Sequence, residues 1–184
     1  MKPTAELSRE HQAILTMIRI LGTMAARLEA GQAVDAGDIE KAVEFIRVFA
    51  DQCHHGKEED RLFPEMEKAG IPRNRGPIGV MLAEHAEGRR NVVAMAEAIP
   101  GIRKADRRAV ASFAVAARGY GELLTQHIQK EDMILYPMAD ARLTPDQQVS
   151  LEAAFADVEK NVVGEGRHEE FHRLLDRLGN AYLT

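Results

Sequence analysis

The sequence predicts an all-α protein: a four-helix up-down bundle with a C-terminal helical extension of one or two helices. Apolar residues recur at three- and four-residue steps along almost the whole chain, which is the spacing of one helix face. Aromatic residues make up only 5%, while alanine, leucine, methionine, glutamate and arginine dominate, and this composition favours helices. No segment of the sequence shows a convincing two-residue alternation of the kind typical of strands.

The chain length bounds the number of domains. With 184 residues, 45% of them hydrophobic, the chain is long enough for one well-buried domain, and two independent cores are not expected. We predict that residues 1–142 form the bundle and that residues 143–184 form an extension packed on it.

The first two helices are predicted from their apolar stripes. The first stripe runs from Leu7 to Leu28, and a loop follows at Gly31. Asp38 is expected to cap the second helix, which should be disturbed near Pro64 because proline cannot donate to the helix ladder. The inner line of this helix has one residue at every fourth position: Ile46, Ala50, His54, Glu58 and Leu62.

The third and fourth helices complete the predicted bundle. Pro77 suits the first turn of the third helix, and Pro100-Gly101 is expected to break the chain at its end. The fourth helix is expected to follow from about Arg103.

Two further helices form the predicted extension. The stretch Thr144-Pro145-Asp146-Gln147 indicates a helix start, because the threonine can cap it and the glutamine lies three residues later. This fifth helix should end near Gly164, and a sixth should cover roughly 167–182.

Charge and cysteine content exclude several classes of partner. The net charge of −5 argues against nucleic acid as the main partner, because duplex binding needs clustered basic residues. The single cysteine, Cys53, excludes an internal disulfide framework and fits a reducing cytosol. No apolar stretch approaches the length of a membrane span, and the first residues lack the apolar core of a signal peptide. We therefore expect a cytoplasmic protein without a membrane partner.

A duplicated pattern of histidines and glutamates is the most informative feature of the sequence. His11 and His54 are 43 residues apart in the first half, and His85 and His127 are 42 apart in the second. In each half a glutamate lies four residues after the second histidine, and a Leu-aromatic-Pro tail follows. The glutamates are Glu58 and Glu131, and the tails are Leu62-Phe63-Pro64 and Leu135-Tyr136-Pro137.

This pattern predicts a metal site inside the bundle. A histidine and a glutamate four residues apart share one helix face, and the flanking positions on that face are apolar. An unpaired carboxylate in an apolar interior is costly, whereas two cations would be good partners for neutral imidazoles and carboxylates. Mixed ligation of this kind favours iron, with manganese as the nearest competitor. The predicted ligands are His11, His54, Glu58, His85, His127 and Glu131.

At these residues the chain resembles the hemerythrin-like, or HHE cation-binding, family. The stretches HHGKEEDRLFP, GPIGVMLAEHAEGR and HIQKEDMILYP carry the resemblance, which covers roughly residues 5–140. It implies a four-helix bundle around two non-haem iron ions with an oxo or hydroxo bridge. Transferred by matching position, the same six residues are the ligands, and the two glutamates bridge.

One difference separates this chain from the oxygen-carrying members of the family, whose third helix offers two histidines four residues apart. Here the neighbours of His85 on its own face are Met81 and Arg89, so one iron lacks a histidine. The set resembles the four-His, two-Glu members, which are linked to repair of iron centres and to nitrosative stress.

Four functions remain open at this point. The site could bind or sense oxygen or nitric oxide, or it could reduce nitric oxide or peroxide with an external electron donor. The protein could instead handle iron or repair iron centres, or the bundle could be an interaction module without metal chemistry. The sequence does not say whether the protein is an enzyme.

Several residues near the predicted ligands have alternative interpretations. We expect His55 and Glu59 to lie on a solvated flank, and Cys53 to fill the core. Asp132 could replace Glu131, because oxygen carriers use a carboxylate five residues after their histidine. His168 and His172 are either surface residues or, if the last helix covers the mouth of the site, a source of the missing imidazole.

Overall fold

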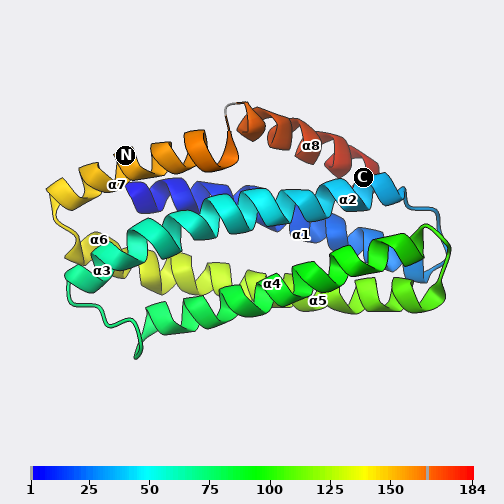
Figure 1. Cartoon of the computed structure of the whole chain (residues 1–184), viewed down its shortest axis with the longest axis horizontal. Coiled ribbons are helices and arrows are strands. Elements are labelled where there is room, and N and C mark those ends of the chain that lie inside the picture. Colours follow the sequence, from blue (N-terminus) through cyan, green and yellow to red (C-terminus); the bar gives the residue numbers. More distant parts are fainter. Residues whose placement is uncertain (1, 165) are drawn as a thin grey trace.

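The computed structural model describes residues 2–164 and 166–184, and within these ranges the chain forms helices and connecting loops without strands (Figure 1). The π-helical segments, in which the ladder joins residues five apart, are labelled η. In chain order the elements are α1 (Pro3–Glu29), α2 (Ala36–Phe45), η1 (Ile46–His55), η2 (Glu58–Leu62), α3 (Phe63–Lys68), α4 (Pro77–Ile102), α5 (Arg107–Lys130), η3 (Glu131–Leu135), α6 (Tyr136–Arg142), α7 (Pro145–Val158), η4 (Glu159–Val163) and α8 (Arg167–Tyr182).

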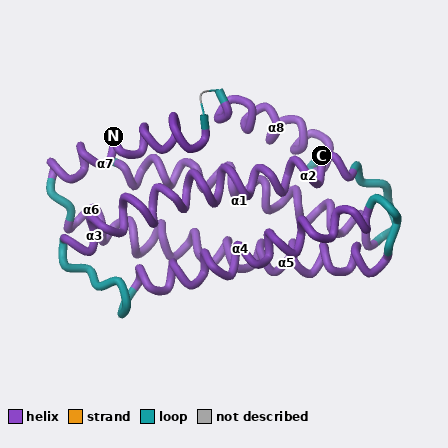
Figure 2. Tube along the Cα trace, in the orientation of Figure 1, coloured by secondary structure: helices purple, strands orange, loops and turns teal. Residues whose placement is uncertain are grey.

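Four antiparallel rods form the bundle, as the apolar periodicity predicts. The rods are α1, the run from α2 to α3, α4, and the run from α5 to α6, and the loops between them lie at the two ends (Figure 2). Buried apolar side chains from all four rods meet along the axis. In the described part of the chain, no helix is both long and apolar enough to cross a membrane.

The two longer rods pass through proline without a loop. Pro64 and Pro137 each follow a π-helical turn, in which the amide of Phe63 donates to Glu58 and that of Tyr136 donates to Glu131. Since proline cannot donate and its ring crowds the carbonyl four residues earlier, a wider turn relieves the clash while the helix continues. The expected disturbance near Pro64 is therefore a change of helix type.

Three predicted helix boundaries are wrong. The fourth rod begins at Arg107, with Asp106 as its cap, whereas Arg103 is the C-terminal cap of α4. Asp35, rather than Asp38, caps α2, and its side chain accepts a hydrogen bond from Gly37. Pro100 lies inside α4 and does not end it. Only one ladder bond is lost near the helix end, whereas continuing the helix buries Ile99 and Ile102.

The two helix starts that were predicted from local sequence are confirmed. Pro77 lies in the first turn of α4. Thr144 and Gln147 form a reciprocal capping box at the start of α7.

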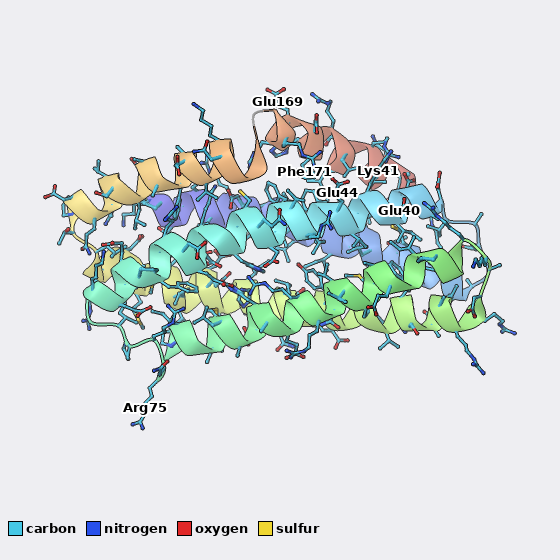
Figure 3. The ribbon with its side chains drawn as sticks, in the orientation of Figure 1. Glu40, Lys41, Glu44, Arg75, Glu169 and Phe171 are labelled. Carbon is cyan, nitrogen blue, oxygen red and sulfur yellow. The ribbon has the colours of Figure 1, made fainter. Side chains whose placement is uncertain are left out.

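The C-terminal helices pack along one side of the bundle, over α1 and the α2 rod (Figure 1). Phe171 points from α8 towards the bundle, whereas Glu169 points away (Figure 3). Leu175, Leu178 and Tyr182 are buried on the same face of α8 as Phe171. The domain boundary after residue 142 remains a prediction.

Candidate metal centre

The six predicted ligand residues lie together in the interior of the bundle, contributed by all four rods. They are His11 on α1, His54 on η1, Glu58 on η2, His85 on α4, His127 on α5 and Glu131 on η3, and none is more than 1% exposed. The Nε2 atoms form two close pairs, His11 with His54 at 3.1 Å and His85 with His127 at 3.0 Å.

The two glutamates lie between these histidine pairs. Glu131 places Oε2 at 3.1 Å from His11 Nε2 and Oε1 at 2.9 Å from His127 Nε2, so its two oxygens face different pairs. Glu58 places Oε2 at 3.4 Å from His85 Nε2 and at 3.9 Å from His54 Nε2. Each carboxylate is therefore within reach of both histidine pairs.

Several buried oxygens in this cluster have no hydrogen-bond donor. Both oxygens of Glu131 and Oε2 of Glu58 are without a hydrogen-bond partner. The nearby histidines use Nδ1 to donate to other acids. A buried carboxylate in this state is costly, and a cation at the point where the ligand atoms converge removes the cost. The residues therefore fit a metal that accepts both imidazole and carboxylate ligands, such as iron or manganese.

The protonation preferences within the cluster differ from residue to residue. Burial would lower the pKa values of His11 and His85, but the neighbouring carboxylates outweigh burial and raise them. Burial and the negative charge of Glu58 raise the pKa of Glu131 well above its ordinary value. Burial lowers the pKa of His54, which keeps that imidazole neutral and able to act as a ligand. Two cations would offset the charge that the fold concentrates here.

A second set of carboxylates orients the imidazole rings. In each of the four histidines Nδ1 donates to an acid, which leaves Nε2 to face the centre of the cluster. The pairs are His11–Asp132 at 3.0 Å, His54–Glu10 at 2.8 Å, His85–Glu59 at 2.7 Å and His127–Glu84 at 2.8 Å. Rings held in this way are preorganised for metal binding.

Lysines support two of these acids. Lys57 is fully buried and donates to Glu10 at 2.6 Å, to Glu6 at 2.7 Å and to Glu159 at 2.7 Å. Burial alone would lower the pKa of Lys57, but its carboxylate partners outweigh burial and raise it. At the matching position of the second half, Lys130 donates to Glu84.

The prediction that His55 and Glu59 lie on a solvated flank is wrong. His55 is buried, and its ring stacks on that of His85 with 3.8 Å between the centroids. Glu59 accepts from His85, as described above. The physical reason is the π-helical turn of η1, whose extra residue per turn reduces the angle between His54 and His55 so that both face the interior.

Arg89 lies one turn after His85 on α4 and is one of the two neighbours of His85 on that face, the other being Met81. Its guanidinium donates to Asp51 at 2.8 Å and to Glu59 at 2.7 Å. Asp51 also accepts from Nδ1 of His55 at 3.3 Å. Burial would raise the pKa of Asp51, but the hydrogen bonds from His55 and Arg89 outweigh it and lower the pKa to about 2.

The alternative interpretation of Asp132 is not favoured by the geometry. Asp132 contacts Nδ1 of His11, on the outer side of that ring, whereas Glu131 faces the Nε2 atoms. Cys53 lies in the core, as expected, and burial raises the pKa of its thiol to about 12.

His168 does not join the cluster of six. Its ligand atom groups with those of Glu10 and Cys53, and its ring packs against Phe49 at 5.1 Å between centroids. Glu10 lies between this histidine and His54. This arrangement does not favour His168 as a ligand, because α8 docks beside the acid that orients His54 and not over the cluster of six.

The aromatic residues of the two Leu-aromatic-Pro tails lie beside the histidines. The ring of Tyr136 stacks on that of His11 at 5.5 Å, and the ring of Phe63 stacks on that of His85 at 6.2 Å. The hydroxyl of Tyr136 donates to Glu58 at 2.8 Å and lies 3.3 Å from Nε2 of His11. The two ends of the cluster are therefore not chemically alike.

Comparison with known proteins agrees with this geometry. The family model described as "Hemerythrin HHE cation binding domain" matches residues 2–139, which is most of the chain. No solved structure matches the chain significantly.

The similar curated proteins have no stated function. "Uncharacterized protein Rv1995" of Mycobacterium tuberculosis and "Uncharacterized protein Mb2018" of Mycobacterium bovis are each 23% identical to this chain over 175 residues. Each match covers 95% of this chain and 67% of the relative.

Proposed function

Because this chain belongs to the hemerythrin HHE cation-binding family, we propose that it is a non-haem di-iron protein that binds or reacts with oxygen, nitric oxide or peroxide. In this proposal the protein either senses oxygen stress or nitrosative stress or protects the cell against it. The single observation that supports it most is the buried carboxylate of Glu131, whose two unpartnered oxygens face different histidine pairs.

The residues divide naturally between two metal positions. His11 and His54 would hold one ion, His85 and His127 would hold the other, and Glu58 and Glu131 would lie between them. Two iron ions in such a site supply reversible electron transfer and open positions for a small ligand. Manganese is the competing metal, since it accepts the same ligands.

The chain's own residues prepare this site in three ways. The acids on Nδ1 fix the orientation of each ring and raise its basicity as a ligand. The surrounding core excludes bulk water, which strengthens the interactions of charges within it. Tyr136 supplies a hydroxyl donor beside His11, at one end of the cluster only.

Residues 1–142 carry the ligands in this proposal, and residues 143–184 stabilise one flank. Glu159 of η4 completes the set of carboxylates around Lys57, which in turn binds Glu10. The extension therefore acts on the site through the acid that orients His54.

The test is metal analysis followed by rapid mixing. The protein, loaded anaerobically with ferrous iron, should contain about two irons per chain if both metal positions fill. Stopped-flow spectra with oxygen, nitric oxide and peroxide in turn then identify the ligand. A stable adduct supports binding or sensing, and turnover with an external electron donor supports an enzyme. A chain that takes up no iron or manganese would overturn the proposal.

A further inference from the structure

His55 interrupts the internal symmetry of the metal centre. The first half reads His54-His55-Gly56-Lys57-Glu58, and the second half reads His127-Ile128-Gln129-Lys130-Glu131. Histidine and glutamate match in both halves, and so does the lysine before each glutamate. The residue after the first histidine does not match, because the first half has a second imidazole where the second half has Ile128.

The Nε2 atom of His55 is buried and has no hydrogen-bond partner. The side chain is only 4% exposed, and its ring stacks on that of His85 at an interplanar angle of 16°. Ligand atoms of His55, Glu58, His85 and His127 all lie within 4.8 Å of one another. A free imidazole nitrogen is thus placed among three groups that the proposed function assigns to a metal.

His55 is also oriented in the same manner as the other four histidines. Its Nδ1 contacts Oδ1 of Asp51 at 3.3 Å, and Arg89 holds that oxygen from the other side at 2.8 Å. Arg89 equally holds Glu59, the acid on His85. One guanidinium therefore fixes the acids behind two stacked imidazoles, and both rings direct Nε2 inward.

A histidine that only fills the core would not need this arrangement. In such a residue both ring nitrogens would have hydrogen-bond partners. Otherwise an apolar side chain would serve equally well, and the matching position of the second half does have one, the buried Ile128. Instead, the inward nitrogen is left without a protein partner while the outward one is held by an acid.

We propose that His55 is the third imidazole ligand of the metal held by His85 and His127. This inference rests on the proposed function and deepens it. The run from α2 to α3 then supplies the histidine that α4 lacks, and the two metals have different numbers of protein ligands. The metal at His11 and His54 keeps one protein ligand fewer, so the small ligand binds there, beside the hydroxyl of Tyr136.

The experiment replaces His55 by the residue that stands at the matching position. His55→Ile and the wild type are loaded anaerobically with ⁵⁷Fe, and iron content, stepwise affinity and Mössbauer spectra are measured. For the wild type we expect two quadrupole doublets of equal area with different parameters. In His55→Ile the dissociation constant of one iron should rise at least about tenfold, and the doublet of that iron should change or disappear.

Two further variants keep the result interpretable. His172→Ala, which removes an exposed histidine of α8 that contacts none of the six residues, should keep both irons and both doublets. Circular dichroism of the metal-free proteins reports whether His55→Ile folds. If it does not, His55→Gln, which is polar and comparable in length, takes its place with the same measurements and the same expectation.

The outcomes separate this inference from the proposed function. A wild-type protein without bound metal would overturn the proposed function itself. A wild-type protein with two irons, together with a folded His55 variant that matches it in iron content, affinity and spectrum, would overturn only the role of His55.

Discussion

Glu10 precedes His11 in α1, yet its carboxylate accepts a hydrogen bond from Nδ1 of His54 on the neighbouring rod, 2.8 Å away. Glu84 and His127 repeat this relationship in the second half, also at 2.8 Å. Each acid thus orients an imidazole on another rod and joins two rods at the depth of the site. Any change at these acids should therefore affect metal binding and helix packing together.

Replacing the central glutamates should remove most of the bound metal. Glu58→Ala and Glu131→Ala each delete a carboxylate that faces both histidine pairs, so we expect iron content to fall well below that of the wild type. Glu59→Ala removes only the acid on Nδ1 of His85, and affinity should fall by about 10- to 100-fold. Iron analysis at several free iron concentrations makes the comparison. Equal loss in all three variants would contradict the assignment of the central carboxylates.

Metal should stabilise the fold. Loading gives partners to the unpaired oxygens of Glu58 and Glu131. At a free metal concentration about 100 times the dissociation constant, the gain is about 2.7 kcal/mol, or roughly 5–10 °C in Tm for a chain of this size. Thermal unfolding of chelated and iron-loaded samples measures the difference, and identical melting temperatures would refute it.

Lys57, which is buried, should contribute more to the free energy of unfolding than Lys130, its counterpart in the second half. Lys57→Met leaves Glu10 buried without its cation, so the free energy of unfolding should fall by about 3–5 kcal/mol. Lys130 is 36% exposed, and Lys130→Met should cost about 0–1 kcal/mol. Urea unfolding of the metal-free variants measures the two losses of unfolding free energy. Equal losses in Lys57→Met and Lys130→Met would contradict the prediction.

Acid should destabilise the metal-free protein partly through Asp51. The fold lowers the pKa of this carboxyl from 3.8 to about 2, so the native state favours the ionised form. Its contribution to stability is full above the unfolded pKa and is lost as pH falls from about 4 to about 2. In Asp51→Asn the pH dependence of the unfolding free energy over this range should be shallower. The same slope in both proteins would show that Asp51 does not contribute.

The sequence predicted the bundle and the cluster of six because both depend on periodic spacing. A spacing of four residues places His54 and Glu58 on one face of an α-helix, and the second half repeats the arrangement with His127 and Glu131. Whether these residues are the metal ligands remains a prediction. The start of α7 was also readable, since a capping box is local to four residues.

The remaining features depend on contacts that periodic spacing does not encode. The inward position of His55 follows from the π-helical turns of η1, whereas ordinary helical geometry places it on a flank. The acids on Nδ1 come from other rods for His11, His54, His85 and His127, so only the packed bundle reveals them. One pattern in the sequence could have pointed to these acids. In each half an acid precedes the first histidine, and the central glutamate has a lysine before it and an acid after it.

Under the proposed function, the position of Lys57 makes docking of the C-terminal segment and occupancy of the metal site parts of one equilibrium. Its ammonium binds Glu159 of η4 and Glu10 at once, and Glu10 holds His54. Release of the segment takes one carboxylate from a buried cation and thereby loosens the orientation of a metal-binding ring. By reciprocity, iron that prefers the oriented ring must favour the docked segment by the same free energy. Limited proteolysis within residues 159–170 should therefore be slower in the iron-loaded protein. The cleavage rate of this segment would then measure how far the metal site is occupied.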